Sequence, residues 1–297
     1  MINVLVTGAN GQLGSELKHI HNKGIVKFDR SVNFVFTDID TLDISNPIFL
    51  KKFFQDHSFD FVINCAAYTN VDLAETEKEK AYNVNATCVK NIVEAIKERN
   101  LSLTKFIHIS TDYVFDGKSH IPYTEEMQTN PKSVYGKSKL EGEIFALQYK
   151  NSMVIRTSWL YSSYGKNFAK TIHKLCNERE SLNVVFDQIG TPTYAYDLAY
   201  AIFQIVKQSV SENRFISGIY HFSNEGVCSW YDFAKLIANK AKSNCVVNPI
   251  ESKDYPTPVA RPFYSVLNKN KIKSNYKLVI PFWQDSLDEY FNITDNK

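Results

Sequence analysis

Short apolar runs alternate with longer amphipathic stretches through the first half of the chain. The apolar runs cover residues 2–6, 33–37, 61–65, 105–109 and 153–156. Between them, residues 12–23, 47–57, 81–99 and 134–149 are long enough for helices. Continuous apolar strands separated by helices are typical of a parallel sheet that is buried on both faces. The pattern therefore predicts an α/β fold with a doubly wound parallel sheet, in which ligands bind at the carboxyl ends of the strands.

The second half of the chain is less regular. Stretches rich in Pro and Tyr occur at residues 191–196 and 255–264, and such stretches favour loops. We therefore expect residues 1–158 to form the sheet domain and residues 159–297 to form mainly a smaller α+β lobe. We also expect the chain to return to the sheet domain around residues 190–222, with a strand near residues 218–222.

Composition narrows the classes of partner. The 297 residues carry a net charge of +2 without a basic block, so binding to nucleic acid or to a membrane surface has no electrostatic support. No apolar run approaches the roughly 20 residues that span a bilayer, and the chain starts without a secretory pattern, which favours the cytoplasm. The five cysteines are widely spread and form no C-x-x-C pair, which predicts a reduced, metal-free interior.

A glycine-rich loop follows the first predicted strand. It consists of Gly8, Ala9, Asn10, Gly11, Gln12, Leu13 and Gly14. The first glycine permits a tight turn, the second lets the backbone approach a pyrophosphate, and the third allows close helix–sheet packing, while the helix N-terminus attracts the anion. A plain tight turn is the simpler interpretation, but the position after the first strand favours a dinucleotide site.

Asp38 ends the second predicted strand, where a carboxylate usually meets the adenosine ribose of a dinucleotide. A carboxylate at this point repels the 2′-phosphate of NADPH, so we expect NADH to be used alongside NADPH. The alternative is a solvated acid at a strand end with no role in binding. The sequence leaves both interpretations open.

Tyr135 and Lys139 lie four residues apart in the fourth helical stretch, and therefore on one face of a helix. An ammonium group near a phenol favours the phenolate, so we expect Lys139 to lower the pKa of Tyr135 and help it exchange a proton with a carbonyl oxygen. A solvated amphipathic pair is the simpler interpretation. Thr111, at the end of the fourth strand, would bring a hydroxyl to the same oxygen, which favours carbonyl chemistry.

With these motifs in order, the chain resembles the extended short-chain dehydrogenases/reductases. More narrowly, it is similar to the dTDP-4-dehydrorhamnose reductases, which carry out the last step of dTDP-L-rhamnose synthesis. The similarity spans nearly the whole chain, through residues 7–14, 64–75, 110–117, 134–142, 156–159, 167–171, 187–193 and 260–262. It implies a Rossmann-like sheet domain with a substrate lobe, and reduction of the C4 keto group of dTDP-4-dehydro-L-rhamnose by NADPH or NADH.

The resemblance also implies roles for individual residues. It implies that Thr111, Tyr135 and Lys139 are catalytic. It implies cofactor contacts by the glycine-rich loop, Asp43, Ile44, Cys65, Ala66, Ala67, Tyr135 and Lys139. Substrate contacts fall to Thr111, Asp112, Tyr113 and Trp159, with Asn167 and Arg261 assigned to the nucleotide diphosphate.

Simpler interpretations of some of these residues stay open. Trp159 could be a core aromatic residue that follows the fifth strand. Cys65 is expected to pack in the interior and to contribute only its backbone to the site, because nothing marks it as a reactive thiol. Arg261 makes the stronger case, since a guanidinium in an otherwise apolar, proline-containing loop suits bidentate binding of phosphate.

The residue pair after Thr111 helps to choose a reaction. Sugar-nucleotide 4,6-dehydratases resemble one another in an Asp-Glu pair there, because elimination of water needs a second acid/base; here the pair is Asp112-Tyr113. Simple carbonyl reduction is therefore favoured. Two alternatives stay open: another 4-ketosugar-nucleotide reductase, such as one that forms 6-deoxytalose, and a non-catalytic regulatory subunit similar to that of methionine adenosyltransferase, which needs no intact proton-transfer set.

No metal is required by this chemistry. Some members of the family are described as metal-bridged dimers that use acidic residues. Glu16 fits one such position, but Tyr196 and Gln284 stand where acids are expected. A magnesium-bridged assembly is therefore not favoured, and we expect a monomer or a homodimer.

Overall fold

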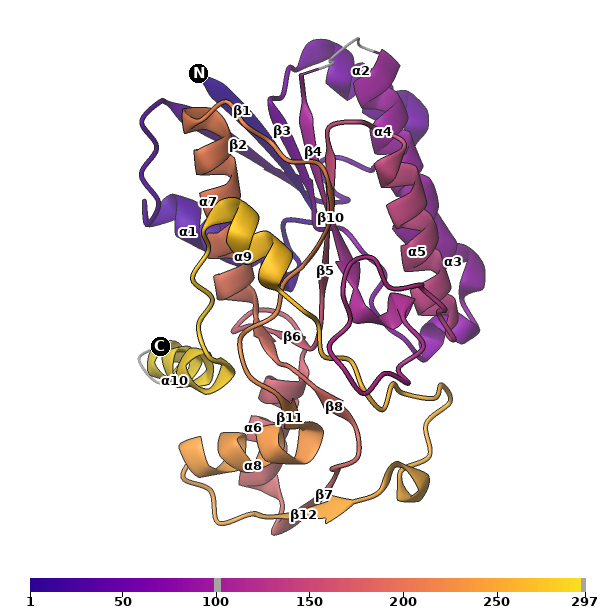
Figure 1. Cartoon of the computed structure of the whole chain (residues 1–297), viewed down its shortest axis with the longest axis vertical. Helices are drawn as coiled ribbons and strands as arrows, with labels where there is room; N and C mark the ends of the chain where they lie inside the picture. The colour runs from indigo at the N-terminus through magenta and orange to yellow at the C-terminus, as the bar shows by residue number, and fades with distance from the viewer. Residues whose placement is uncertain (99–102, 295–297) are drawn as a thin grey trace.

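The computed structural model of the chain describes residues 1–98 and 103–294. A six-stranded parallel sheet lies at its centre, with the strand order β10-β5-β4-β3-β1-β2 (Figure 1). The strands are β1 (Ile2–Thr7), β2 (Val32–Thr37), β3 (Phe61–Asn64), β4 (Lys105–Thr111), β5 (Ser152–Thr157) and β10 (Gly218–His221). The predicted doubly wound α/β fold is confirmed, and the strand bounds differ from the predicted ones by one or two residues.

Helices cover both faces of this sheet, because alternate residues of each strand point to opposite sides. Val4 and Val6 of β1 pack with α1 (Gln12–Asn22) and α7 (Ala195–Ser211). Leu5 between them packs with α2 (Pro47–Asp56), α4 (Cys88–Glu98) and the end of α5 (Val134–Leu147). The two helical layers lie on opposite sides of the strands (Figure 1). Because both faces of the sheet are buried, its strands are unbroken apolar runs in the sequence.

The prediction of one helix over residues 81–99 is wrong at its start, and its last residue, Arg99, lies outside the described residues. The segment is divided into α3 (Lys78–Tyr82), a π-helical turn (Asn83–Thr87) and α4. The turn lies against α5, where a Cβ atom on Gly142 would come within 2.1 Å of the backbone oxygen of Asn85. This contact between distant segments is not visible in a local hydrophobic pattern.

Within the described residues, the second lobe contains three two-stranded sheets and three α-helices, drawn in the lower half of Figure 1. The strand pairs are β6 (Leu160–Tyr161) with β9 (Thr193–Tyr194), β7 (Ser181–Val185) with β12 (Val246–Ile250), and β8 (Ile189–Gly190) with β11 (Cys228–Ser229). Its helices are α6 (Phe168–Glu178), α8 (Trp230–Lys240) and α10 (Trp283–Thr294). A separate apolar cluster, which includes Tyr161, Phe233 and Trp283, holds them together.

Two segments from the second half of the chain return to the first half. α7 packs against α1, and β10 pairs in parallel with β5 at the edge of the sheet. α9 (Asn270–Tyr276) packs beside them. Across residues 1–98 and 103–294, no helix has the length and apolar character needed to cross a membrane.

Candidate active site

A cavity of about 1000 Å³ lies at the carboxyl ends of the sheet strands. Thr7 ends β1, Thr111 ends β4 and Thr157 ends β5, and each of them lines it. Most of the residues singled out from the sequence line the same space, namely Gly8, Asn10, Gly11, Gln12, Leu13, Asp38, Asp43, Ile44, Cys65, Ala66, Ala67, Thr111, Asp112, Tyr113, Tyr135, Lys139, Trp159 and Asn167. Gly14 and Arg261 are not among the lining residues.

The glycine-rich loop forms one wall of the cavity. Gly8 has a φ of 69°, and a Cβ atom on it would come within 2.5 Å of the amide nitrogen of Ala66. Gly14 lies beneath the loop, against the backbone oxygen of Gly8. Gly11 precedes α1 and has no capping side chain, which leaves the N-terminus of α1 for an anion. The loop therefore fits the pyrophosphate of a dinucleotide.

Asp38 joins this loop to the end of β2. One carboxylate oxygen accepts a 2.8 Å hydrogen bond from the amide of Asn10, and the other accepts one of 2.8 Å from the amide of Ile39. The carboxylate also lines the cavity. Asp38 is therefore a structural part of the loop, which the sequence alone did not indicate.

Tyr135 and Lys139 occupy one face of the first turns of α5. Ser133 caps the helix by accepting a 3.0 Å hydrogen bond from the amide of Gly136. Tyr135 is 9% exposed and Lys139 is 1% exposed. The Nζ atom of Lys139 donates a 2.6 Å hydrogen bond to the backbone oxygen of Ile109, so β4 holds the ammonium group in place.

Burial sets the protonation of both groups. It raises the pKa of Tyr135 to about 12, against the opposing effect of a hydrogen bond with the side chain of Thr111. It lowers the pKa of Lys139 to about 8, against the attraction of Glu143. The prediction that the pKa of Tyr135 lies below that of a free tyrosine is therefore wrong for this structure, because desolvation of the phenol is the largest influence on it.

Asp112 and Tyr113 follow β4 in a short 3-10 turn (Asp112–Val114). The Thr111 hydroxyl donates a 3.0 Å hydrogen bond to Oδ1 of Asp112. The ring of Tyr113 meets that of Tyr135 edge to face, with the centroids 5.5 Å apart. These contacts bring Asp112 and Tyr113 beside the proposed proton-transfer residues.

Trp159 lies on the opposite wall, in the second lobe. Its backbone has a φ of 47°, and its ring stacks on that of Trp230 with the centroids 3.5 Å apart. A Cβ atom on Gly190 would come within 2.5 Å of the same ring. Trp159 therefore packs in the second lobe and lines the cavity at once. Sequence reasoning missed Trp230, because nothing local links residues 159 and 230.

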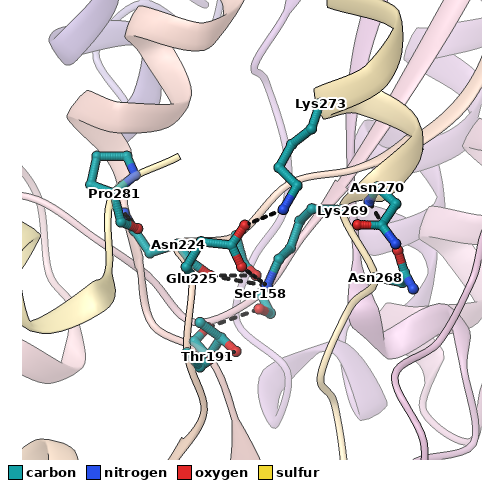
Figure 2. A network of polar contacts seen from close by, with 11 residues as sticks. Ser158, Thr191, Asn224, Glu225, Asn268, Lys269, Asn270, Lys273 and Pro281 are labelled. Atoms are coloured by element: carbon teal, nitrogen blue, oxygen red, sulfur yellow. Dashed lines mark hydrogen bonds and ion pairs between the residues drawn. The ribbon is translucent and has the colours of Figure 1, made fainter. Parts of the chain in front are cut away.

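A polar network supports the chain just before Trp159 (Figure 2). The Ser158 hydroxyl donates a 2.9 Å hydrogen bond to the backbone oxygen of Thr191. Beside it, the Nζ atom of Lys269 lies 3.3 Å from both the backbone oxygen of Asn224 and a carboxylate oxygen of Glu225. Lys273 reaches the same carboxylate at 2.7 Å. Segments that are far apart in the sequence thus fix this edge of the cavity.

Asn167 and Arg261 contact protein groups. The amide nitrogen of Asn167 donates hydrogen bonds to Oε1 of Gln12 at 2.9 Å and to the backbone oxygen of Ser162 at 2.7 Å. Asn167 thereby joins the second lobe to the glycine-rich loop. Arg261 forms a 2.5 Å ion pair with Asp72, a residue of the β3–α3 connection. The other guanidinium nitrogen, Nη1, is buried without a hydrogen-bond partner in the described part of the chain.

Several lining residues were missed from the sequence. They are Thr7, Ile39, Leu42, Ser45, Thr69, Val71, Lys80, Asn83, Val84, Cys88, Ile109, Ser110, Thr157, Ser158, Leu160, Gly165 and Lys166. Ser110 and Ser158 lie beside predicted residues at strand ends, so the strand-end rule could have found them. Glu16, considered as a metal ligand, is buried and accepts a 2.6 Å hydrogen bond from Ser162. Within the described residues, no group of three or more His, Cys, Asp or Glu side chains could hold a metal.

Comparison with known proteins now gives the family. The family model described as the RmlD substrate binding domain matches residues 2–296. The chain belongs to this family. It is 40% identical to a dTDP-4-dehydrorhamnose reductase of Aggregatibacter actinomycetemcomitans over 294 residues, which cover 97% of each chain. It is also 36% identical to the reductase of that name from Escherichia coli K12, with 98% of this chain and 97% of the relative covered.

Solved structures of RmlD-family relatives share the whole architecture. A dTDP-4-dehydrorhamnose reductase from Clostridium acetobutylicum has a TM-score of 0.89 and 38% identity, with 99% of this chain and 100% of that chain covered. The protein of that name from Bacillus anthracis, solved in complex with NADP, also has a TM-score of 0.89 and 38% identity, with 98% and 99% covered. A UDP-glucose 4-epimerase at 18% identity and a TM-score of 0.80 shares the fold alone.

Proposed function

We propose that this RmlD-family protein reduces the C4 keto group of dTDP-4-dehydro-L-rhamnose to give dTDP-L-rhamnose, with NADPH or NADH as the reductant. One observation carries the proposal: a hydroxyl pair suited to proton transfer, Thr111 and Tyr135, shares a single cavity with a loop suited to a dinucleotide. The relatives that bear this name supply the identity of the sugar and the nucleotide.

The cofactor would be held by the wall that carries the glycine-rich loop. The N-terminus of α1 suits the pyrophosphate, and Asp38 lies where the adenosine ribose is expected. The backbone of Cys65, Ala66 and Ala67 and the segment of Asp43 and Ile44 complete this wall. When bound, the reduced nicotinamide supplies a hydride for C4 of the sugar.

Tyr135 donates its phenolic proton to the C4 oxygen. With its pKa raised to about 12, the phenol is protonated at neutral pH, which is the state that reduction requires. Thr111 donates a hydrogen bond to the same oxygen, and this bond strengthens as negative charge develops there. Lys139, whose pKa is lowered to about 8, remains mainly charged at neutral pH and would hold the ribose hydroxyls of the cofactor.

The second lobe would bind the sugar nucleotide. Trp159 lines the cavity and suits the sugar, and Tyr113 lines the same cavity just after the end of β4. Arg261 is assigned to the diphosphate. Its guanidinium group forms an ion pair with the carboxylate of Asp72, which supports the binding of an anionic group at this position. Asn167 is assigned to the same region, although its side-chain amide nitrogen donates to Gln12, Ser162 and Tyr164. We keep residues 1–158, with the return of the chain around residues 190–222, as the cofactor part, and residues 159–297 as mainly the substrate part.

The remaining expectations concern the setting of the enzyme. We infer a cytoplasmic protein that is a monomer or a homodimer, binds no nucleic acid and associates with no membrane. A purely regulatory role is disfavoured, because Thr111, Tyr135 and Lys139 converge on one cavity. The neighbouring Asp112-Tyr113 pair provides no glutamate for elimination of water, which argues against dehydration.

A direct assay tests the proposal. Purified protein is mixed with NADPH and dTDP-4-dehydro-6-deoxyglucose, with and without a 3,5-epimerase. NADPH oxidation only when the epimerase is present supports the rhamnose assignment. Oxidation without the epimerase indicates a different 4-ketosugar-nucleotide reductase, and no oxidation in either sample, in protein that binds NADPH, supports a regulatory subunit.

A further inference from the structure

Asp112 is a buried acid beside the proton-transfer residues. Its side chain is 4% exposed, and it lines the cavity at the end of β4. Its Oδ2 atom is buried and has no hydrogen-bond partner in the part of the chain that the structure describes. Burial of a carboxylate with one oxygen unpaired is unfavourable, although its Oδ1 atom accepts the hydrogen bond from Thr111. The protonated acid is therefore the form that this environment favours.

Thr111 connects this acid to Tyr135. The Thr111 hydroxyl is 3.0 Å from Oδ1 of Asp112 and is also hydrogen-bonded to the side chain of Tyr135. The amide of Tyr113 donates to the same hydroxyl at 3.3 Å, which helps to keep it between the two groups. A hydroxyl can accept one proton while it gives up another. The three side chains thus form a continuous line from the acid to the phenol.

We propose that Asp112 is a proton reservoir that reprotonates Tyr135 through the hydroxyl of Thr111. The inference rests on the proposed function, in which Tyr135 loses its proton to the C4 oxygen of the sugar. The Thr111 hydroxyl, which donates to Asp112 in the resting structure, turns toward Tyr135 and gives its proton to the phenolate. Thr111 then takes the carboxylic proton of Asp112 from Oδ1. The carboxylate regains a proton from water when the product leaves, so no net charge accumulates. No electrons move in these steps.

The energetics and the surroundings agree with this direction of transfer. Burial raises the pKa of Asp112 to about 7, although hydrogen bonds from the hydroxyls of Thr111 and Ser265 and from the backbone amides of Asp112 and Tyr113 oppose the shift. The pKa of Tyr135 is about 12, so a proton moves favourably from the acid to the phenolate. The titratable groups near Asp112 are Tyr113 and Tyr135. The charges of Asp72 and Arg261 face Tyr113 and have opposite effects on its pKa.

The test compares Asp112→Asn with Asp116→Asn. Asp116 lies in the same segment and accepts hydrogen bonds from the Lys118 amide and the Tyr123 hydroxyl instead, so the control makes the same Asp-to-Asn change and leaves the relay in place. For the wild type and the control, kcat should fall as the pH rises through about 7. Asp112→Asn should lose this pH dependence and be roughly tenfold slower below it, a modest share of what general acid catalysis supplies. Thr111→Val should also lose the pH dependence.

A second readout does not depend on turnover. The infrared band of the protonated carboxyl should disappear as the pH rises through about 7 in the wild type, and this change should be missing only in Asp112→Asn. A band that is already lost below about pH 5, as for an ordinary aspartate, contradicts the proposal. So does a raised KM in Asp112→Asn with the pH dependence intact, which would make Asp112 a sugar contact. Wild-type protein that reduces no 4-ketosugar nucleotide contradicts the proposed function instead.

Discussion

The two walls of the cavity are built in different ways. The wall with the glycine-rich loop comes from the strand ends of the parallel sheet and the helix that follows β1, and each of these pieces is a local pattern in the sequence. The opposite wall depends on contacts between distant segments, such as Trp159 stacked on Trp230 and Arg261 paired with Asp72. The parallel sheet and its turns mainly determine the first wall, and side-chain contacts between distant segments determine the second.

This difference places the groups proposed for the chemical step on one wall and the groups proposed for substrate selectivity on the other. Proton transfer and the proposed cofactor contacts belong to the wall fixed by backbone, which the parallel sheet supports directly. The proposed sugar and diphosphate contacts belong to the wall fixed by side chains, where single substitutions can change the fit without altering the sheet. Variants in the first wall should therefore affect turnover or cofactor use, and variants in the second wall should affect the sugar nucleotide.

The largest effect is expected for Tyr135→Phe in the first wall. The change removes the proton donor and keeps the ring, so kcat should fall by roughly 10²–10⁴ while cofactor binding survives. Tyr149→Phe is the control, because it removes another buried hydroxyl, one that donates to the backbone of Thr104. Steady-state kinetics at saturating substrates measures both. Turnover within about twofold of the wild type would show that another group protonates the sugar.

Arg261→Ala probes the second wall. Loss of a charged hydrogen-bond partner costs roughly 1.5–3 kcal/mol, or about ten- to a hundredfold in affinity for dTDP. Asp72→Asn should not weaken the binding of dTDP, because it removes only the carboxylate that pairs with the guanidinium group of Arg261. Arg179→Ala, in the same lobe, is the control. Calorimetric titration with dTDP measures all three.

Trp159→Ala completes the test of the second wall. It should leave dTDP binding nearly unchanged and lower kcat/KM for the sugar nucleotide, because the ring is assigned to the sugar. Calorimetry and steady-state kinetics separate the two effects. If Trp159→Ala and Arg261→Ala weaken dTDP equally, the tryptophan is misassigned.

Asp38→Ala tests the first wall, and we expect a smaller effect on the use of the cofactor. The variant should reduce kcat/KM with NADH by about tenfold, since a hydrogen bond to a charged group is worth about 1.5 kcal/mol. NADPH should be less affected, although loss of the bond to Asn10 weakens the loop for both cofactors. Asp40→Ala, exposed nearby, is the control. A wild-type preference for NADPH above about a hundredfold, roughly 2.7 kcal/mol, would place the carboxylate away from the ribose.

Lys139→Met should change how the stability of the protein depends on pH. The pKa of Lys139 is lowered to about 8 in the folded protein and is near 10.4 when unfolded. The folded state is therefore penalised below about pH 8 and relieved as the pH rises toward 10.4. Wild-type stability relative to Lys139→Met should increase over that interval. Thermal unfolding at several pH values measures it, and exposed Lys137→Met should show no such trend.

The sequence predicted the first wall far better than the second. The glycine-rich loop and the helix face with Tyr135 and Lys139 are local patterns, and the strand-end rule placed them in one cavity. The π-helical turn at Asn83–Thr87 and the small sheets of the second lobe were not predicted, because they depend on packing between distant segments. Desolvation of Tyr135 was also missed, since burial is a property of the folded chain.

The central claim is that this cavity carries out reduction at C4 of a sugar nucleotide. The most direct measurement supplies NADPH deuterated in the transferred position together with the epimerase-treated substrate, and locates the label by mass spectrometry and NMR. The account predicts one deuterium on C4 of the dTDP-rhamnose formed, and almost no labelled product with Tyr135→Phe. A label at another carbon, or NADPH oxidation without a labelled sugar, would contradict it.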